Sequence, residues 1–442
     1  MLNVLAGNCI CWINTVCYTS IINNFPFDPQ VAVGLATSYV GLSAKIYTDI
    51  VDVLSSSSSD ATSRAKNYLL LNSILPLIVS LVTTPMLLKD VVSNKDTKAD
   101  KAVQSGFTLM FFVTIVTGIY SIIGSLGWKI VESPWLYAVG LAVLLILIPL
   151  MIPLGLRVGG FIKICNLSME GDHVSANSTD DNKEVVMEMK ELEKVVAQDS
   201  SISVTGSDDS IGSCTSSSRE EIGVKLMVRR LEFWLYFFVY MFGSTLGLVF
   251  MNNLGQIAES RGQSSATTSS LVSLSSAFCF FGRLLPSLLH HFSGNKYMIS
   301  TTTSIATLMA PISAAFYLLA FNSGIVSLYI STVVIGLCIG SFTSISVSAT
   351  TELFGTKNFS INHNIVVGNI PIGSFVFGTG AALLYEKNKK SNHMMNMTNI
   401  CMGAECYNIT FIIWGCISLL GTLLAFVLHL RTRKFYQQKQ LR

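Results

Sequence analysis

The chain has 442 residues, of which half are hydrophobic and only 12% are charged. Its mean hydropathy of +0.55 lies outside the range of ordinary soluble domains. The formal net charge of +3 is too small to indicate a nucleic-acid partner. Composition therefore predicts an integral, multi-pass membrane protein whose solvent is the lipid bilayer, in either the plasma membrane or an endomembrane.

Eleven long apolar runs predict an all-α, polytopic fold with about eleven transmembrane helices. Each run approaches or exceeds the ~20 residues that a helix needs to cross about 30 Å of hydrocarbon. Five runs precede an acidic, serine-rich segment and six follow it: 1–22, 31–53, 67–88, 106–126, 135–157, 232–254, 266–289, 297–320, 323–348, 363–385 and 408–430.

The acidic segment, residues 166–230, divides the chain into regions. It contains 13 of the 26 acidic residues, and its polar composition predicts a largely disordered loop. Within it, residues 183–198 have helical spacing and could bind a protein partner, although a solvated linker is the alternative. The predicted regions are a transmembrane part at 1–165, this loop, a six-helix half at 231–432 and a basic tail at 433–442.

Charge predicts the orientation. The tail carries arginine and lysine but no acid, which places it in the cytosol by the positive-inside rule. The loop at 386–407 should then lie outside and the acidic loop inside, although three lysines at 387–390 argue against this. In the outer loop, Cys401 and Cys406 are a candidate disulfide, and Asn396 begins a glycosylation sequon.

The same count of spans places Met1 outside. A chain that starts directly inside an apolar run, without a signal peptide, predicts that its amino-terminal end is missing.

Polar residues in the first two runs are candidate contacts for a solute or coupling ion. Asn14 and Tyr18 form an i,i+4 pair, and Lys45 and Asp49 fall on one face of the second run. A lysine in hydrocarbon should face a water-filled path and pair with a carboxylate. The alternative is that the span ends near residue 47 and these side chains reach the interface.

Amides in the later runs are further candidates. They lie at the end of the sixth run and in the tenth run: Asn252, Asn253, Gln256 and Asn369. Such amides either hydrogen-bond a solute or only join helices. The tenth run also contains Gly368 and Pro371, an interruption that often accompanies a bend near a transport path or, equally, close packing.

The seventh run predicts a gate at its cytosolic end. Arg283 and, in the following turn, Lys296 could pair with an acid across the bundle and release it as the halves rock. Glu352, in the next cytosolic loop, is the candidate partner.

Motifs for catalysis and cofactors are not found. The sequence has no Walker motif, zinc motif, Ser-His-Asp array or Gly-rich nucleotide fold. We therefore expect no catalytic residues, metal or cofactor, and no enzyme activity.

Four stretches resemble one family. They are Gly7–Ile50 (GNCICWINTVCYTSIINNFPFDPQVAVGLATSYVGLSAKIYTDI), EFWLYFFVYMFGSTLGLVFMNNLGQIAES, FFGRLLPSL and TELFGTKNF. They resemble the plant nodulin-like, nuclear fusion defective 4-like proteins of the major facilitator superfamily. The resemblance implies a bundle of that type with an incomplete amino-terminal half, because the first run resembles the family's fourth helix. It also implies similarity to monocarboxylate and oxalate/formate carriers.

These observations favour a secondary active transporter that moves a small solute, with a coupling ion, by alternating access. Lys45 and the family resemblance weakly favour an organic anion such as a mono- or dicarboxylate. The alternative is a membrane sensor or scaffold that transports nothing, or a truncated paralogue without function.

We expect Lys45→Ala to abolish solute uptake, because the lysine would supply the charge that holds an anion in the path. Uptake should be compared at equal surface abundance. Normal uptake by the variant would assign Lys45 to the membrane interface.

Overall fold

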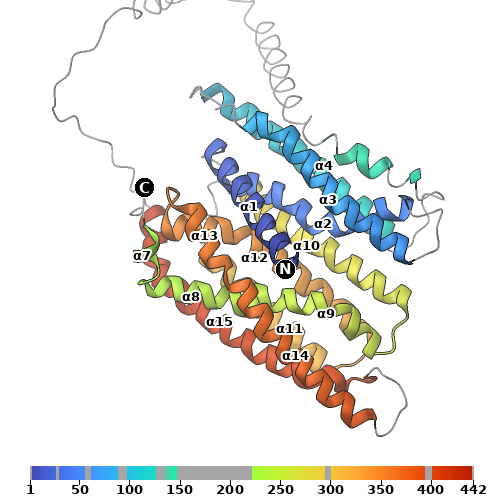
Figure 1. Ribbon diagram of the computed structural model, residues 1–442. Coiled ribbons are helices and arrows are strands. Elements are labelled where there is room, and N and C mark those ends of the chain that lie inside the picture. The colour runs from blue at the N-terminus through green and yellow to red at the C-terminus, as the bar shows by residue number, and fades with distance from the viewer. Residues whose placement is uncertain are drawn as a thin grey trace, which may run out of the picture.

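The computed structural model describes residues 2–25, 29–54, 61–87, 97–125, parts of 135–147, 222–293, 300–393 and 401–440. Every regular element in these ranges is helical, and none is a strand (Figure 1). The all-α, polytopic membrane fold is therefore confirmed.

Two groups of helices are described. The first is α1 (Leu2–Asn24), α2 (Pro29–Leu54), α3 (Ala61–Leu87) and α4 (Thr97–Ser125). The second is α7 (Val224–Met227), α8 (Leu231–Tyr240), η1 (Met241–Thr245), α9 (Leu246–Ser260), α10 (Ser265–Ser293), α11 (Thr301–Phe321), α12 (Ile325–Phe354), α13 (Phe359–Val367), α14 (Asn369–His393) and α15 (Glu405–Gln440).

Eight of the eleven predicted runs coincide with described helical segments that are long and apolar enough to cross a membrane. These are α3, α4 and the six spans that follow residue 230. The runs at 1–22 and 31–53 form α1 and α2. More than half of the run at 135–157, and the acidic loop up to residue 221, lie outside the described residues.

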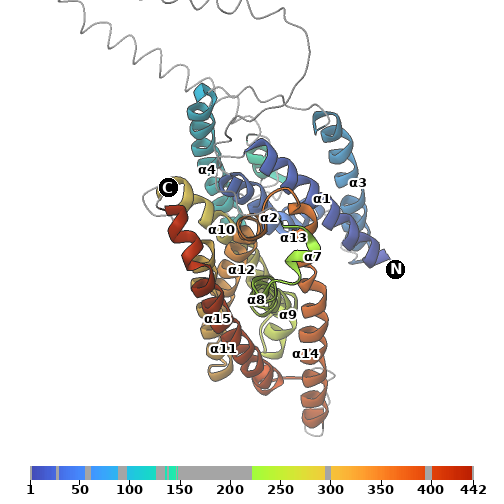
Figure 2. The same ribbon diagram turned by 90° about the vertical axis from the view of Figure 1, so that its left-hand side faces the viewer.

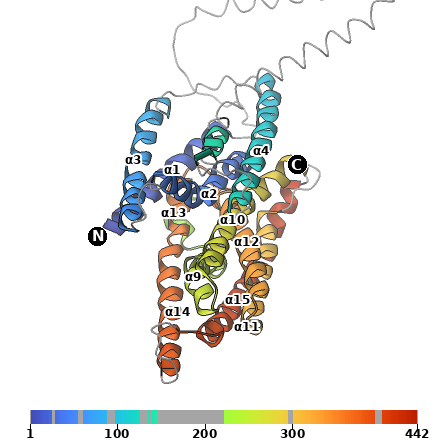
Figure 3. The same ribbon diagram turned by 90° about the vertical axis from the view of Figure 1, so that its right-hand side faces the viewer.

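The second group forms a bundle, and α1, α2 and α4 lie against it (Figures 1 and 2). Helix α2 packs on α10 and α12, whereas α1 packs on α2 and α13. We call the end of the bundle where α13 begins and α15 finishes the tail end (Figure 1). Helix α3 packs on α2, and none of its membrane-spanning segment is buried by the residues that the structure describes (Figure 3).

Glycines allow helices to approach closely, both between the two groups and within the second group. A Cβ on Gly41 of α2 would lie 2.7 Å from the backbone nitrogen of Phe280 on α10. One on Gly340 of α12 would lie 2.2 Å from the carbonyl oxygen of Cys279. Helices in lipid associate mainly through such packing, since burial from hydrocarbon adds no hydrophobic driving force.

Large aromatic side chains fill the core of the second group. Phe316 of α11 packs edge-on against Phe250 of α9 and Trp414 of α15, with ring centroids 5.9 and 5.6 Å apart. Edge-to-face pairs at this spacing are favourable and fix the relative positions of their helices.

A compact set of contacts joins the helix ends away from the tail end. Cys401 and Cys406, the candidate pair of the sequence, form a disulfide in the structure. Beside it, the amide of Gly403 donates to the carbonyl of Ser260 at 2.7 Å. Arg261 donates to the carbonyl of Leu319 at 2.8 Å and so satisfies a carbonyl in the last turn of α11.

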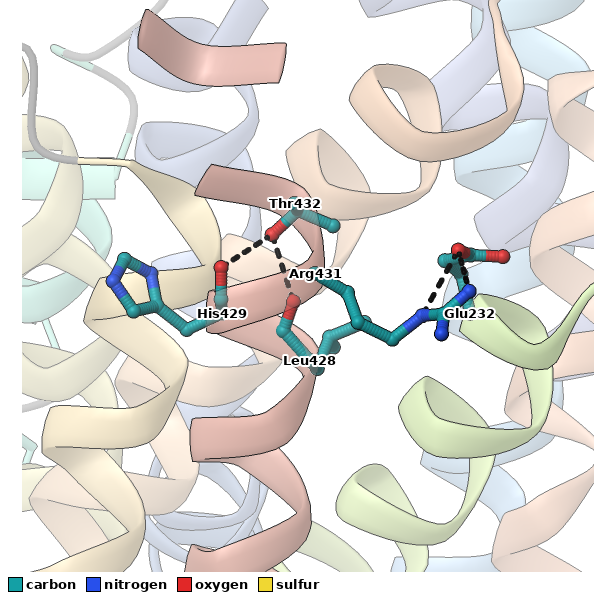
Figure 4. Close-up of polar contacts among 5 residues, drawn as sticks. All are labelled: Glu232, Leu428, His429, Arg431 and Thr432. Carbon is teal, nitrogen blue, oxygen red and sulfur yellow. Dashed lines mark hydrogen bonds and ion pairs between the residues drawn. The ribbon is translucent and has the colours of Figure 1, made fainter. Parts of the chain in front are cut away.

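An ion pair joins α8 and α15 near the tail end (Figure 4). Arg431 donates to one carboxylate oxygen of Glu232 from Nη2 at 3.1 Å and from Nε at 3.3 Å. His429 points to the other side of α15, where its Nδ1 lies 3.1 Å from the hydroxyl of Thr303. Because the ion pair is partly exposed, it contributes at most about 1 kcal/mol.

We expect Gly41→Ala to lower the apparent Tm in detergent, because its methyl group would overlap the α10 backbone. Overpacking of this kind costs about 1–3 kcal/mol. Gly380→Ala is the matched control, since a Cβ there has nothing within 4 Å. Equal Tm values for the two variants would contradict the close contact.

Candidate functional site

Arg283 is a partly buried cation near the middle of the bundle. Its backbone nitrogen lies 2.9 Å from the position of a Cβ on Gly340, which is close to the midpoint of the 30-residue helix α12. Sequence had suggested a cytosolic helix end for Arg283, and the structure corrects this. The neighbouring Gly282 lets α12 approach, so that Arg283 is held between α12 and α2.

The guanidinium of Arg283 is only partly satisfied. Its Nη1 donates to the carbonyl oxygen of Thr37 on α2 at 3.1 Å, while its buried Nε has no hydrogen-bond partner. No carboxylate among the described residues forms an ion pair with it. Arginine has five N–H donors and stays charged, so Arg283 retains capacity for an anion.

Two tyrosines lie near Arg283, one from each of the two groups of helices, which we call the two halves. Tyr18 lies on α1, and the fully enclosed Tyr240 ends α8 beside Ser244 and Ser346. The charge of Arg283 acts electrostatically on both phenol groups. The surroundings of the cation are therefore rich in hydroxyl groups and come from both halves of the molecule.

Two interrupted helices meet close to this group. The π-helical turn η1 separates α8 from α9, and α13 gives way to α14 at Gly368. The Thr245 hydroxyl of η1 donates to the side-chain oxygen Oδ1 of Asn369 at 2.7 Å, and the side-chain nitrogen Nδ2 of Asn369 donates to the backbone carbonyl of Val366 at 2.6 Å. Asn369, a solute candidate from sequence, is thus fully buried and connects the two interruptions.

Helix α1 meets α13 toward the tail end. Thr15 and Asn364 exchange two hydrogen bonds of 3.1 and 2.9 Å. The rings of Tyr18 and His363 lie 5.7 Å apart at nearly a right angle. We call these two pairs the α1–α13 contact. It joins the first group of helices to the second.

The predicted gating pair is not brought together in this conformation. Glu352 lies twelve residues beyond Gly340 on α12, which corresponds to about 18 Å along the helix from the level of Arg283. Its carboxylate accepts a hydrogen bond from Thr301. Lys296 lies outside the described residues. A gating role for these three residues stays a prediction.

The outer amides take part in contacts within the protein. Asn253 donates to the carbonyl of Val249 in its own helix at 2.8 Å. Gln256 accepts a hydrogen bond from Tyr407 at 2.8 Å, and Asn252 is exposed. Asn14 is partly exposed on α1. A role in solute binding stays a prediction for all four.

Other candidates cannot be placed. Lys45 and Asp49 belong to α2, but their side chains lie outside the described part of the structure, and so does Asn396.

Sequence reasoning did not single out Tyr240, Thr245 or His363. Tyr240 and Thr245 lie in an apolar run where nothing but Gly243 marks the π-helical turn. His363 stands among asparagines that look like an interfacial helix start. The signal that would have found it is its place five residues before the Gly368 interruption.

Comparison with known proteins identifies the family. Residues 1–154 match the nodulin-like family, and residues 216–438 match the family defined as the NFD4 C-terminal domain. Protein NUCLEAR FUSION DEFECTIVE 4 of Arabidopsis thaliana is 34% identical over 447 residues, covering 98% of this chain and 72% of that protein. The chain belongs to the nodulin-like, NFD4 family.

A second relative is more distant than the Arabidopsis NFD4 protein. The probable transporter MCH1 of Yarrowia lipolytica is 24% identical over 192 residues, which are 41% of this chain and 38% of that protein.

We expect Asn369→Ala to lower the apparent Tm, because it leaves the Thr245 hydroxyl and the Val366 carbonyl without their partner. A buried polar group left unsatisfied costs about 1–3 kcal/mol. The matched control is Asn253→Ala, which removes one bond within a single helix and should change stability by about 0.5 kcal/mol or less. Similar Tm shifts for both variants would show that Asn369 does not couple the interruptions.

Proposed function

We propose that this NFD4 family member is a secondary active transporter of the major facilitator type. It moves a small organic anion, such as a mono- or dicarboxylate, by alternating access. No chemical step is involved, and a solute or ion gradient supplies the energy. The similarity to MCH1 of Yarrowia lipolytica, a probable transporter, supports the assignment to transporters.

The observation that carries this proposal is the position of Arg283. An ionisable residue near the middle of a spanning helix is costly, and such residues usually serve a substrate or ion path. Arg283 has an unsatisfied buried nitrogen and no ion-pair partner among the described residues. A carboxylate would provide the missing charge and could accept two parallel N–H bonds from the guanidinium.

Interrupted helices support the same location. Secondary transporters commonly bind their solute near the bilayer midplane, where broken helices expose polar backbone and side chains. Here η1 and the α13–α14 junction meet at Thr245 and Asn369. Tyr18 and Tyr240 provide hydroxyl groups for a solute held by Arg283.

The contacts between the halves suggest how access alternates. The positive-inside rule assigns the tail end to the cytosol. There the α1–α13 contact closes the path, and Gln30 of α2 accepts a hydrogen bond from Ser348 of α12. Rocking of the halves would break these few polar contacts and open the site to the cytosol.

We expect Arg283→Gln to reduce carboxylate uptake at least about tenfold, because losing a charged hydrogen-bonding partner costs more than the 1.4 kcal/mol that corresponds to a factor of ten. The test uses the full chain in proteoliposomes with labelled pyruvate and oxalate. Arg431→Gln, which removes an arginine from the surface ion pair with Glu232, should transport normally.

Uptake by Arg283→Gln equal to that of Arg431→Gln would reject Arg283 as the anion site. Absence of flux for every carboxylate, with capture of a protein by the 166–230 loop, would favour the sensor or scaffold instead.

A further inference from the structure

His363 is a nearly buried ionisable side chain where the two halves touch. Only 5% of its surface is exposed. Its Nδ1 lies 3.1 Å from the Thr350 hydroxyl on α12, and its ring stacks on Phe359 with centroids 5.0 Å apart. The third neighbour, Tyr18, comes from the other half. The imidazole is therefore enclosed by one hydroxyl group and two aromatic rings.

Charged groups on the surrounding elements do not neutralise this position. The titratable and charged side chains on the described neighbours toward this end come from five elements: Cys17 and Tyr18 on α1, Lys225 on α7 with Arg229 and Arg230 after it, Glu232, Tyr236 and Tyr240 on α8, Glu352 on α12 and Lys357 before α13. Neither acid forms an ion pair with His363. Glu232 pairs with Arg431, and Glu352 accepts from Thr301. Both lysines are exposed.

A protonated imidazole is poorly compatible with this packing. It would be a buried cation without a carboxylate partner among the described residues, and such a group is costly away from water. Separating α1 from α13 would admit water to the ring and remove that cost. Protonation of His363 and closure of the α1–α13 contact therefore oppose each other.

Tyr18 connects His363 with the anion site. The ring of Tyr18 packs edge-on against the His363 ring, and the positive charge of Arg283 also acts on the Tyr18 phenol group. A bound carboxylate would cancel the positive charge of Arg283 nearby. Tyr18 would then be the shared neighbour of the bound anion and of the His363 ring.

We propose that His363 binds the proton that is co-transported with the organic anion, and that its protonation opens the α1–α13 contact. A ring nitrogen of His363 takes up a proton that enters from the side of the membrane opposite the tail end. It releases the proton after the α1–α13 contact has opened, so this N–H bond is the only covalent bond that forms and breaks. The inference rests on the proposed function and adds its coupling ion and the residue that carries it.

The first test measures opening without any solute. The full chain with Thr15→Cys and Asn364→Cys is treated with a bifunctional thiol reagent between about pH 8 and about pH 5, which brackets histidine titration. The cross-linked peptide is quantified by mass spectrometry. Its yield should fall several-fold toward acid pH with His363 present and should not show this fall with His363→Asn. Thiol ionisation changes the cross-link yield in the same way in both backgrounds, so the ratio of the two yields at each pH does not depend on it.

The second test separates coupling from transport. In proteoliposomes, His363→Asn should keep exchange of labelled pyruvate for unlabelled pyruvate but lose accumulation driven by a pH gradient. His429→Asn is the matched control, because His429 also lies 3.1 Å from a threonine hydroxyl but sits between α11 and α15. It should accumulate pyruvate like the unmodified protein.

A cross-link yield with the same pH dependence in both backgrounds overturns the proton site, and so does gradient-driven accumulation by His363→Asn. A His363-dependent cross-link in a protein that carries neither pyruvate nor oxalate would instead reject the proposed solute class while supporting the proton site. The two failures are therefore distinguishable.

Discussion

A backbone group that loses its helical partner inside hydrocarbon must find another partner within the protein, and this constraint shapes the centre of the molecule. Both helix interruptions, η1 and the α13–α14 junction, lie inside helical segments that are long and apolar enough to cross a membrane. Asn369 satisfies a carbonyl of its own broken helix and binds Thr245 of the other. The two interruptions therefore stabilise each other, and they hold polar side chains at a depth where straight helices would present few.

Around that centre, polar groups are distributed unevenly. The tightest packing, between α2, α10 and α12, uses glycine and backbone rather than charge. Among the described residues, polar pairs between the halves include Thr15 with Asn364, Gln30 with Ser348 and Thr37 with Arg283. A rigid, glycine-packed hinge beside an easily broken polar contact is the combination that rocking of two bundles requires. Arg283 lies where these two kinds of contact meet.

Sequence was sufficient for the membrane-crossing helices, because a span needs a long apolar run and little else. The interruption near Gly368 was also foreseeable, since Pro371 cannot donate a hydrogen bond to the preceding turn. The position of Arg283 along the length of the bundle could not be foreseen from the sequence. Its predicted apolar run ends at residue 289, which suggested that Arg283 lies at a helix end, and only the packing of α10 on α12 places it near the middle. Of the neighbours of His363, Phe359 and Thr350 are near in the chain, but Tyr18 comes from α1, so no local pattern could predict the contact between the halves.

The isolation of α3 has a mechanical consequence. Helix α3 packs on α2, one of the helices that would tilt in the proposed rocking, and its spanning segment is not buried by the described part of the chain. Each tilt of α2 would therefore drag α3 sideways through lipid, and the lipid must flow around it. Bilayer viscosity and thickness would then act on the motion as a frictional load, so that the surrounding membrane takes part in setting its speed.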